Sequence, residues 1–338
     1  MCKCSSVLFR KGKQYGLVLA GALMATMFAV TGAVAEGPKV RVLATTYPVY
    51  LLTRAVAQSS PDVQVDLLIP AQTGCPHDYA LTPKDMQKLS QARIVVINGL
   101  GLEAFLEKPL ASAGKITVID SSAGISPIAE DQDDDHDAGH AGTDKAHGAD
   151  HAAAAAKGHE AAHEHGGANP HIFSSPLQAA AMVRNIGRGL AAAEPVAAKN
   201  CPEAADAYAA RLETLAQRMA AVGANAANKN VVALHDGMAY LVRDAGLNLV
   251  DVIQEDEEAQ PSAARLLELV KKIKESKPVV LIGEPQYSDK PVRALAAETG
   301  VPAVQLDPLA SGPTNAPLDY YETVMTKNCT ILEKSFAK

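Results

Sequence analysis

Eight short runs rich in β-branched residues, separated by helical patterns, are the feature of this 338-residue sequence that most restricts its fold. The runs fall into two groups of four, on either side of a long segment of different composition. Strands that alternate with helices in this way predict mainly parallel sheets covered by helices. The predicted strands are 40–46, 63–69, 94–98 and 116–120 in the first group and 231–234, 247–253, 279–283 and 303–306 in the second.

The segment between the two groups carries a long helical pattern. Over 202–222 apolar residues recur at helical spacing, so the simplest interpretation is one helix that joins the groups. A helix start is marked where Thr82-Pro83 and Asp85 form a capping-box pattern with proline in the first turn. The sequence therefore predicts two α/β lobes with mainly parallel four-stranded sheets. We place the N-terminal lobe at 36–200, the joining helix at 201–227 and the C-terminal lobe at 228–338.

The stretch 130–165 differs from everything around it. It holds ten carboxylates and seven of the ten histidines, and it lacks Val, Ile, Leu, Met and aromatic residues. With so little to bury, it is predicted to be a disordered loop within the N-terminal lobe. One interpretation is a solvated acidic linker. The other is loose metal capture, because linkers are seldom dense in histidine and neutral imidazoles coordinate metals near pH 7.

The N-terminus has the pattern of a secretory signal peptide. Four basic residues precede an uncharged apolar run at 17–30, and Ala33-Val34-Ala35 then offers small residues for cleavage. The run is shorter than the roughly 20 residues that a membrane-spanning helix needs. We therefore predict a signal peptide over 1–35 and a periplasmic mature protein. Removing the four positive charges takes the net charge from -7 to -11, which disfavours binding to nucleic acid.

Three cysteines lie beyond the predicted signal peptide, in an exported chain where disulfides can persist. An odd number leaves one thiol unpaired. We prefer a Cys201–Cys329 pair, although spacing does not settle the pairing. Cys75 would then be a free thiol or a soft alternative ligand for a metal, since it stands two residues before His77.

Outside 130–165 the sequence contains three histidines, and each follows a predicted strand or precedes a predicted helix. They are His77, His171 and His235. Two carboxylates, Glu284 and Asp307, close the last two predicted strands in the same way. Because ligands of open α/β sheets bind outside the carboxyl ends of the strands, these side chains can converge on one cleft. Taken singly, each histidine could instead be a hydrogen-bonded or surface residue, and each carboxylate a helix cap.

Histidines together with a carboxylate favour one kind of metal site. Neutral imidazoles and one carboxylate oxygen make a tetrahedral zinc site, with ligand distances of about 2.0–2.2 Å. Four protein ligands leave no position for a reactive water, so such a site favours binding over catalysis. A zinc hydrolase would need an open position and a nearby base, for which Glu284 is the one candidate.

The chain resembles a metal-binding component of a bacterial ABC importer, of the ZnuA zinc-uptake type. The resemblance spans essentially 38–335 and rests on an ordered series of motifs. These are Pro76-His77-Asp78-Tyr79 with Thr82-Pro83, Asn98-Gly99-Leu100-Gly101-Leu102-Glu103, Asn169-Pro170-His171-Ile172, His235-Asp236-Gly237-Met238-Ala239-Tyr240, Glu284-Pro285-Gln286-Tyr287 and Leu306-Asp307-Pro308-Leu309.

The resemblance implies two lobes bridged by a long rigid helix, with one metal bound between them. By motif, the implied metal ligands are His77, His171, His235 and Asp307. Glu284 matches a family glutamate that would orient a ligand histidine. Zinc-type members have a His-rich charged loop where 130–165 lies, whereas manganese-type members tend to have a carboxylate at the position of His235. Since imidazole suits zinc and oxygen-rich sites suit manganese, the implied metal is Zn²⁺.

The predicted function is therefore capture of Zn²⁺ and its delivery to an ABC permease in the inner membrane. The protein would be a monomer and not an enzyme, with zinc as its cargo and the 130–165 loop as an auxiliary capture or sensing element. Two alternatives keep metal binding but change either the metal or the role. One is a manganese or iron carrier of the same fold, and the other is a periplasmic zinc store or chaperone.

Overall fold

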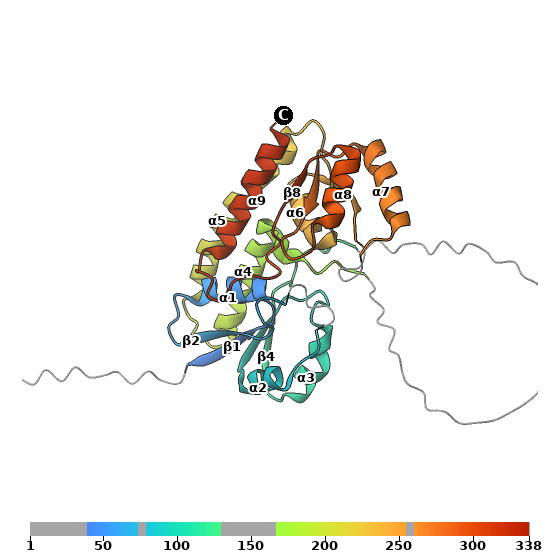
Figure 1. Cartoon of the computed structure of the whole chain (residues 1–338). Coiled ribbons are helices and arrows are strands. Elements are labelled where there is room, and N and C mark those ends of the chain that lie inside the picture. Colours follow the sequence, from blue (N-terminus) through green and yellow to red (C-terminus); the bar gives the residue numbers. More distant parts are fainter. Residues whose placement is uncertain (1–38, 74–78, 130–166, 255–259, 338) are drawn as a thin grey trace, which may run out of the picture. The chain divides into compact units, whose positions relative to one another are not determined.

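The computed structural model describes residues 39–73, 79–129, 167–254 and 260–337. Within these ranges the chain forms two four-stranded sheets with helices between the strands (Figure 1). All eight predicted strands are present, each with ends within two residues of the prediction. The strands are β1 (Val40–Ala44), β2 (Val63–Leu67), β3 (Ile94–Ile97), β4 (Thr117–Asp120), β5 (Asn230–Ala233), β6 (Asn248–Val252), β7 (Val280–Gly283) and β8 (Ala303–Gln305).

The two sheets have the same strand order. The first sheet runs β2-β1-β3-β4 and the second runs β6-β5-β7-β8, with parallel pairing between neighbours throughout the described part of both. In each sheet the chain leaves the first strand to one side and then returns to the other. A topological switch therefore lies between β1 and β3 and between β5 and β7, the position where open α/β sheets bind ligands. The predicted fold class is confirmed.

Helices connect the strands, as parallel neighbours require a crossover. The capping box predicted at Thr82 is formed, with the Thr82 side chain accepting a hydrogen bond from the Asp85 backbone N–H. The helices are α1 (Tyr47–Ala57), α2 (Pro83–Gln91), η1 (Ala104–Leu106), α3 (Glu107–Ser112), η2 (Ile172–Ser174), α4 (Pro176–Ala193), α5 (Cys201–Asn225), η3 (Asp236–Met238), α6 (Ala239–Asp244), α7 (Ala263–Ser276), α8 (Lys290–Thr299) and α9 (Tyr320–Phe336).

Helix α5 is the predicted joining helix, and its 25 residues span about 37 Å between the first sheet and β5. It lies beside the C-terminal helix α9 (Figure 1). Arg211 pairs with Glu322 at 3.0 Å, and Arg218 pairs with Glu333 at 2.6 Å. Residue numbers rise together along both helices, so α5 and α9 run in the same direction. These pairs are largely exposed, so the apolar faces of the helices supply most of the packing energy.

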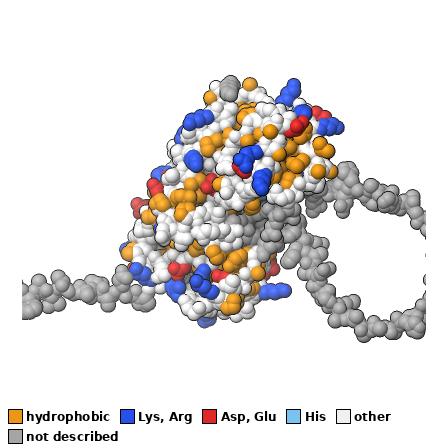
Figure 2. Space-filling model, in the orientation of Figure 1, with side chains coloured by type: hydrophobic (Ala, Val, Ile, Leu, Met, Phe, Trp, Pro, Cys, Tyr) orange, Lys and Arg blue, Asp and Glu red, His pale blue; other side chains and the backbone are white. Residues whose placement is uncertain are grey.

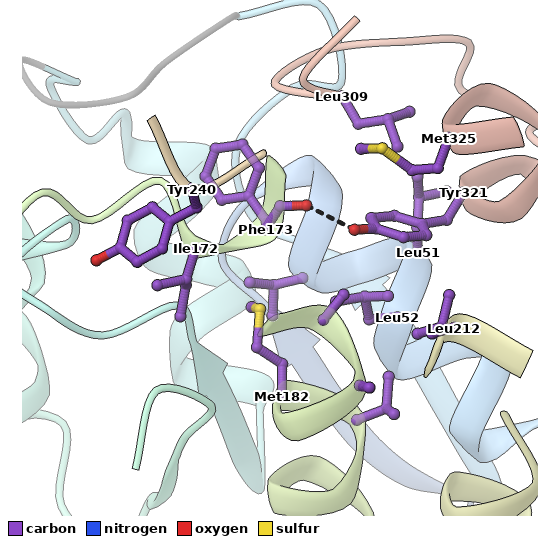
Figure 3. Close-up of a cluster of buried hydrophobic side chains, with 14 of the residues drawn as sticks. Leu51, Leu52, Ile172, Phe173, Met182, Leu212, Tyr240, Leu309, Tyr321 and Met325 are labelled. Atoms are coloured by element: carbon purple, nitrogen blue, oxygen red, sulfur yellow. Dashed lines mark hydrogen bonds between the residues drawn. The ribbon is translucent and has the colours of Figure 1, made fainter. Parts of the chain in front are cut away.

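One buried cluster contains side chains from both sheets and from α1, α4, α5 and α9. Tyr208, Tyr240 and Tyr321 are among its largest fully buried members. Figure 3 shows part of this cluster, where the Tyr321 hydroxyl of α9 donates a 2.7 Å hydrogen bond to the Phe173 carbonyl of η2. The segment that carries His171 therefore packs against residues that are distant in the sequence.

The preferred Cys201–Cys329 disulfide is wrong, because both cysteines are free and buried. Cys201 begins α5, where its sulfur lies 3.4 Å from the Ser60 hydroxyl. Cys329 lies on α9 and contacts Glu333, which pairs with Arg218 near the other end of α5. Along α5, 17 residues separate Cys201 from Arg218, which corresponds to about 25 Å. A disulfide needs the Cα atoms of its two cysteines within about 7 Å.

The surface shows no concentration of one charge on the face in Figure 2, where basic and acidic side chains lie among apolar ones. The large apolar side chains that are exposed lie singly on different elements; examples are Val118, Val196 and Leu267. Among the helices that the structure describes, none is long and apolar enough to cross a membrane.

Candidate metal centre

His235 and Glu284 meet at the switch point of the second sheet. His235 follows β5 and Glu284 follows β7, and these strands are neighbours in register. The side chains are 3% and 1% exposed, and His235 Nδ1 lies 2.9 Å from Glu284 Oε1. The ring of Tyr287 stands at 90° to the imidazole, with 4.3 Å between the ring centroids. The imidazole is therefore enclosed by a carboxylate and an aromatic ring.

This contact decides which ring nitrogen of His235 faces a ligand. A carboxylate 2.9 Å from Nδ1 favours the ring form that carries its proton on that nitrogen, which leaves the lone pair of Nε2 for coordination. A carboxylate partner also raises the basicity of a ligating imidazole. The expectation that Glu284 would orient a candidate ligand histidine agrees with this geometry.

His171 is held by the segment that precedes η2. It is 4% exposed, and its backbone N–H and its Nδ1 lie 2.9 and 3.1 Å from the Asn169 side-chain oxygen. The Phe173 ring lies edge-on to the imidazole at 5.8 Å. One residue before the histidine, the Pro170 carbonyl accepts a 2.9 Å hydrogen bond from the Asn98 side chain, which follows β3. The end of β3 thus supports the segment that carries His171.

The two histidines converge around Gly237 in η3. A methyl group placed on this glycine would lie 3.6 Å from His235 Nδ1, 3.9 Å from His171 Cδ2 and 4.0 Å from Glu284 Oε2. Glycine therefore leaves room beside both imidazoles that a side chain would fill. The structure brings His171, His235 and Glu284 together from three separate parts of the chain.

A second buried carboxylate occupies the corresponding place in the first sheet. Glu103 is 6% exposed and accepts hydrogen bonds from the Thr45 hydroxyl at 2.6 Å and from the backbone of Asn98 at 2.7 Å and Gly99 at 3.1 Å. Thr45 and Asn98 follow β1 and β3, so Glu103 ties together the strand ends at this switch point. Burial raises its pKa to about 7, although the three donors act in the opposite direction.

The turn that delivers these donors depends on glycine. Gly99 has a φ of 89°, in the left-handed region, and an added Cβ would lie only 2.2 Å from a carboxylate oxygen of Asp120. Another side chain there would strain the backbone and collide with β4. The Asn98–Glu103 motif therefore holds Asn98 in place to bind the segment that carries His171.

Asp307 follows β8, the neighbour of β7. Its Oδ1 accepts hydrogen bonds from the Gln286 side chain at 2.7 Å and the Leu309 backbone at 2.8 Å. Asn328 of α9 binds both the backbone N–H and the carbonyl of Asp307. The carboxylate is thus held firmly, with two donors concentrated on one oxygen.

The predicted ligand set is only partly within the described residues. His77 and Cys75 lie outside them, as do the predicted signal peptide over 1–35 and the 130–165 stretch. In the ranges described above, no three His, Cys, Asp or Glu side chains are grouped closely enough to hold a metal ion. The described part brings two candidate histidines together and places Asp307 at the end of a neighbouring strand.

Sequence reasoning missed the roles of four polar residues that support these candidates: Asn98, Glu103, Asn169 and Gln286. One of them had a local signal. Asn169 lies two residues before His171, the spacing at which an asparagine oxygen accepts the backbone N–H of residue i+2. The contacts of Glu103 and Asn98 with distant segments had no comparable signal.

Two parallel α/β sheets, with candidate ligands at the carboxyl ends of strands in the second sheet, are the architecture of a solute-binding protein. A family model described as "ZnuA: Zinc-uptake complex component A periplasmic" matches residues 42–335. The chain belongs to this family.

Relatives and solved structures agree with that assignment. The zinc-binding protein AdcA of Streptococcus pyogenes is 31% identical over 303 residues, which cover 88% of this chain and 56% of AdcA. The solute-binding protein FpvC of Pseudomonas aeruginosa, solved in complex with Mn²⁺, has a TM-score of 0.70 at 25% identity and covers 88% of this chain and 98% of FpvC. Zn(II)-bound AdcA from Streptococcus pneumoniae has a TM-score of 0.68 at 27% identity, over 89% of this chain and 58% of AdcA. The chain thus spans a little more than half the length of these AdcA proteins.

Proposed function

We propose that this protein captures Zn²⁺ and delivers it to an ABC permease. The observation that carries the proposal is the convergence of two buried imidazoles on Gly237, each with an acceptor facing its Nδ1. Membership of the zinc-uptake family and the similarity to zinc-binding AdcA support zinc as the cargo. Binding and release are the whole function, and we propose no reaction.

The proposed ligands are His77, His171, His235 and Asp307. Nε2 of His171 and His235 would each supply a lone pair, because Nδ1 of each ring faces an acceptor. Asp307 would supply a carboxylate oxygen from the end of β8, and His77 a third imidazole. Three imidazoles and one carboxylate match the ligand types that zinc prefers.

Membership of the same family supports a proposal for the setting of this activity. We propose a monomer in the periplasm, exported by the signal peptide 1–35, with the inner-membrane permease as its partner. The proposed organisation is an N-terminal lobe over 36–200, a linking helix over 201–227 and a C-terminal lobe over 228–338.

The 130–165 stretch is proposed to capture or sense zinc near this site. The described residues on either side of it support the idea, because the Asn169 backbone N–H donates a 2.8 Å hydrogen bond to the Ile128 carbonyl. The described residues that flank the stretch are therefore joined two residues before His171, where weak ligands would raise the local zinc concentration. Its dense histidine and carboxylate content supplies those ligands.

The test is metal stoichiometry and affinity on chelator-stripped mature protein, measured by competition with a zinc-binding dye. The wild type is compared with a variant lacking 131–165 and with His171→Ala. We expect one tight site that survives the deletion but not His171→Ala, and weaker sites that vanish with the deletion. If the deletion abolishes all zinc binding, the stretch is the binding element and the four-ligand assignment is wrong.

Manganese is the second candidate cargo, because FpvC was solved with bound Mn²⁺. Imidazole at 235 favours zinc, and a carboxylate there would favour manganese. His235→Glu should therefore lower the ratio of zinc to manganese affinity. An unchanged ratio would contradict His235 as a ligand. A zinc store or chaperone would instead show several weak sites and no dependence of zinc uptake on the permease.

A further inference from the structure

Asn169 uses every polar atom it has, and it is 2% exposed. Its backbone N–H donates to the Ile128 carbonyl at 2.8 Å, and its carbonyl accepts from the Tyr240 hydroxyl at 2.7 Å. The side-chain oxygen faces His171, and the side-chain nitrogen donates to the carbonyl and the carboxylate of Asp236 at 3.1 and 2.8 Å. These partners lie in three separate segments of the chain, at Ile128, at His171 and at Asp236 to Tyr240.

The partners fix which way the amide points. Both Asp236 atoms are acceptors, so the atom of Asn169 facing them must be the nitrogen, which donates. The Asn169 oxygen therefore faces His171 and can only accept. A hydrogen must then lie on His171 Nδ1, and the ring carries its lone pair on Nε2.

The same amide also connects the two histidine segments. Asp236 is the residue after His235 and before Gly237, the point around which both imidazoles converge. The Asn169 amide therefore holds the His171 ring and the start of η3 against each other. The Tyr240 hydroxyl reinforces this link from α6, since it also accepts from the Ile128 backbone N–H at 3.0 Å.

We propose that Asn169 is a positioning residue for zinc binding: one amide that sets the His171 tautomer and fixes the spacing between the His171 and His235 segments. Asn169 itself does not touch the metal. The inference rests on the proposed function, because it requires His171 to be a zinc ligand. It adds that the affinity of the site depends on a neutral side chain that is not itself a zinc ligand.

Asn169→Ala and Asp236→Ala test the proposal beside a matched control. Asn185→Ala removes another asparagine whose side chain binds two backbone carbonyls, those of Ser121 and Ala123, away from the histidines. Zinc affinity is measured by dye competition on the full mature chain. We expect Asn169→Ala to weaken zinc binding about 10–100-fold, the usual effect of removing a group that orients a metal ligand. The control should stay within about twofold.

The tautomer is read directly in metal-free protein, by nitrogen-15 NMR of the imidazole rings with His171 assigned by its substitution. We expect the Nδ1–H form in the wild type and a mixture in Asn169→Ala. Asn169→Asp keeps an acceptor for His171 but loses the donor to Asp236, so it should keep the tautomer and still weaken zinc binding. Asp236→Ala changes a side chain that is 43% exposed, so it should fold and show a smaller loss than Asn169→Ala.

Two results separate the failure of this inference from that of the proposed function. Wild-type zinc affinity and an unchanged tautomer in Asn169→Ala, with binding lost in His171→Ala, would overturn the role of Asn169 alone. Tight zinc binding by His171→Ala would instead overturn the ligand assignment on which the role rests. If Asn169→Ala does not fold, the tautomer and affinity of Asn169→Asp and Asp236→Ala decide the question.

Discussion

The two switch points of the molecule have the same topology, and each has a buried carboxylate. The two carboxylates contact different kinds of group. At β5 and β7, Glu284 lies directly against the ring of His235. At β1 and β3, Glu103 binds backbone groups and a threonine hydroxyl, and it reaches the His171 segment only through Asn98. The group nearest to His171 Nδ1 is the neutral Asn169 amide at 3.1 Å, and the Asp236 carboxylate stands farther away at 3.9 Å.

This difference teaches that one fold can hold two ligand histidines by distinct means. A carboxylate partner both orients an imidazole and makes it a stronger ligand, whereas an amide partner only orients it. The two sides should therefore respond differently to substitution and to pH. The predictions below test that contrast, from the largest expected effect to the smallest.

Removal of either ligand histidine should have the largest effect. His235→Ala and His171→Ala are each expected to weaken zinc binding by more than the roughly 100-fold that orienting groups produce. His235→Ala should be the more severe, because it also removes the imidazole that stands 2.9 Å from the buried Glu284 carboxylate. Isothermal titration with zinc and thermal melting check both effects. If His235→Ala and His171→Ala lose equal affinity and equal stability, the proposed contrast between the two histidines is wrong.

The buried Glu103 should make the stability of the fold depend on pH. Its folded pKa of about 7 lies above the ordinary value of 4.5, so folded protein binds more protons than unfolded protein between these values. Stability is therefore expected to fall as pH rises from 4.5 to 7, by about 3 kcal/mol for a shift of this size. Urea unfolding across this range measures the slope. Glu103→Gln should reduce the slope of unfolding free energy against pH. An equal slope in that variant would contradict Glu103 as the group responsible.

Tyr240→Phe should lower the free energy of unfolding by about 2 kcal/mol, because the Asn169 carbonyl and the Ile128 N–H both lose the Tyr240 hydroxyl as a partner. Tyr321→Phe is the matched comparison, since it removes a single bond to the Phe173 carbonyl and should cost about 1 kcal/mol. Chemical denaturation gives both values. A smaller loss for Tyr240→Phe than for Tyr321→Phe would show that the double contact adds nothing.

Glu284→Gln should have the smallest effect on zinc affinity among these variants, and it separates charge from orientation. The glutamine oxygen can still accept from His235 Nδ1, so the ring keeps its direction but loses its anionic partner. We expect about tenfold weaker zinc binding, at the low end of the range for such changes. Competition titration at pH 7 measures it. Glu284→Ala should lose more, and identical values for the two variants would mean that only the charge of Glu284 matters.

The sequence by itself determined the local structure of this protein. Alternating β-branched runs and helical patterns located all eight strands, and the Thr82 capping box formed as its spacing predicted. These signals work because periodicity and capping depend on residues a few positions apart. The position of His235, Glu284 and Asp307 at strand ends was readable for the same reason.

Only the tertiary structure decided which strand ends meet and what holds them. Strand order places β5 beside β7, and so His235 beside Glu284, although 49 positions separate them in the sequence. The parallel course of α5 and α9 separates Cys201 from Cys329 and excludes the expected disulfide. Asn169 meets Asp236 and Tyr240 across some 70 residues. Such contacts arise when buried polar groups must all find partners in the packed chain, a condition that acts through space and leaves no periodic trace in the sequence.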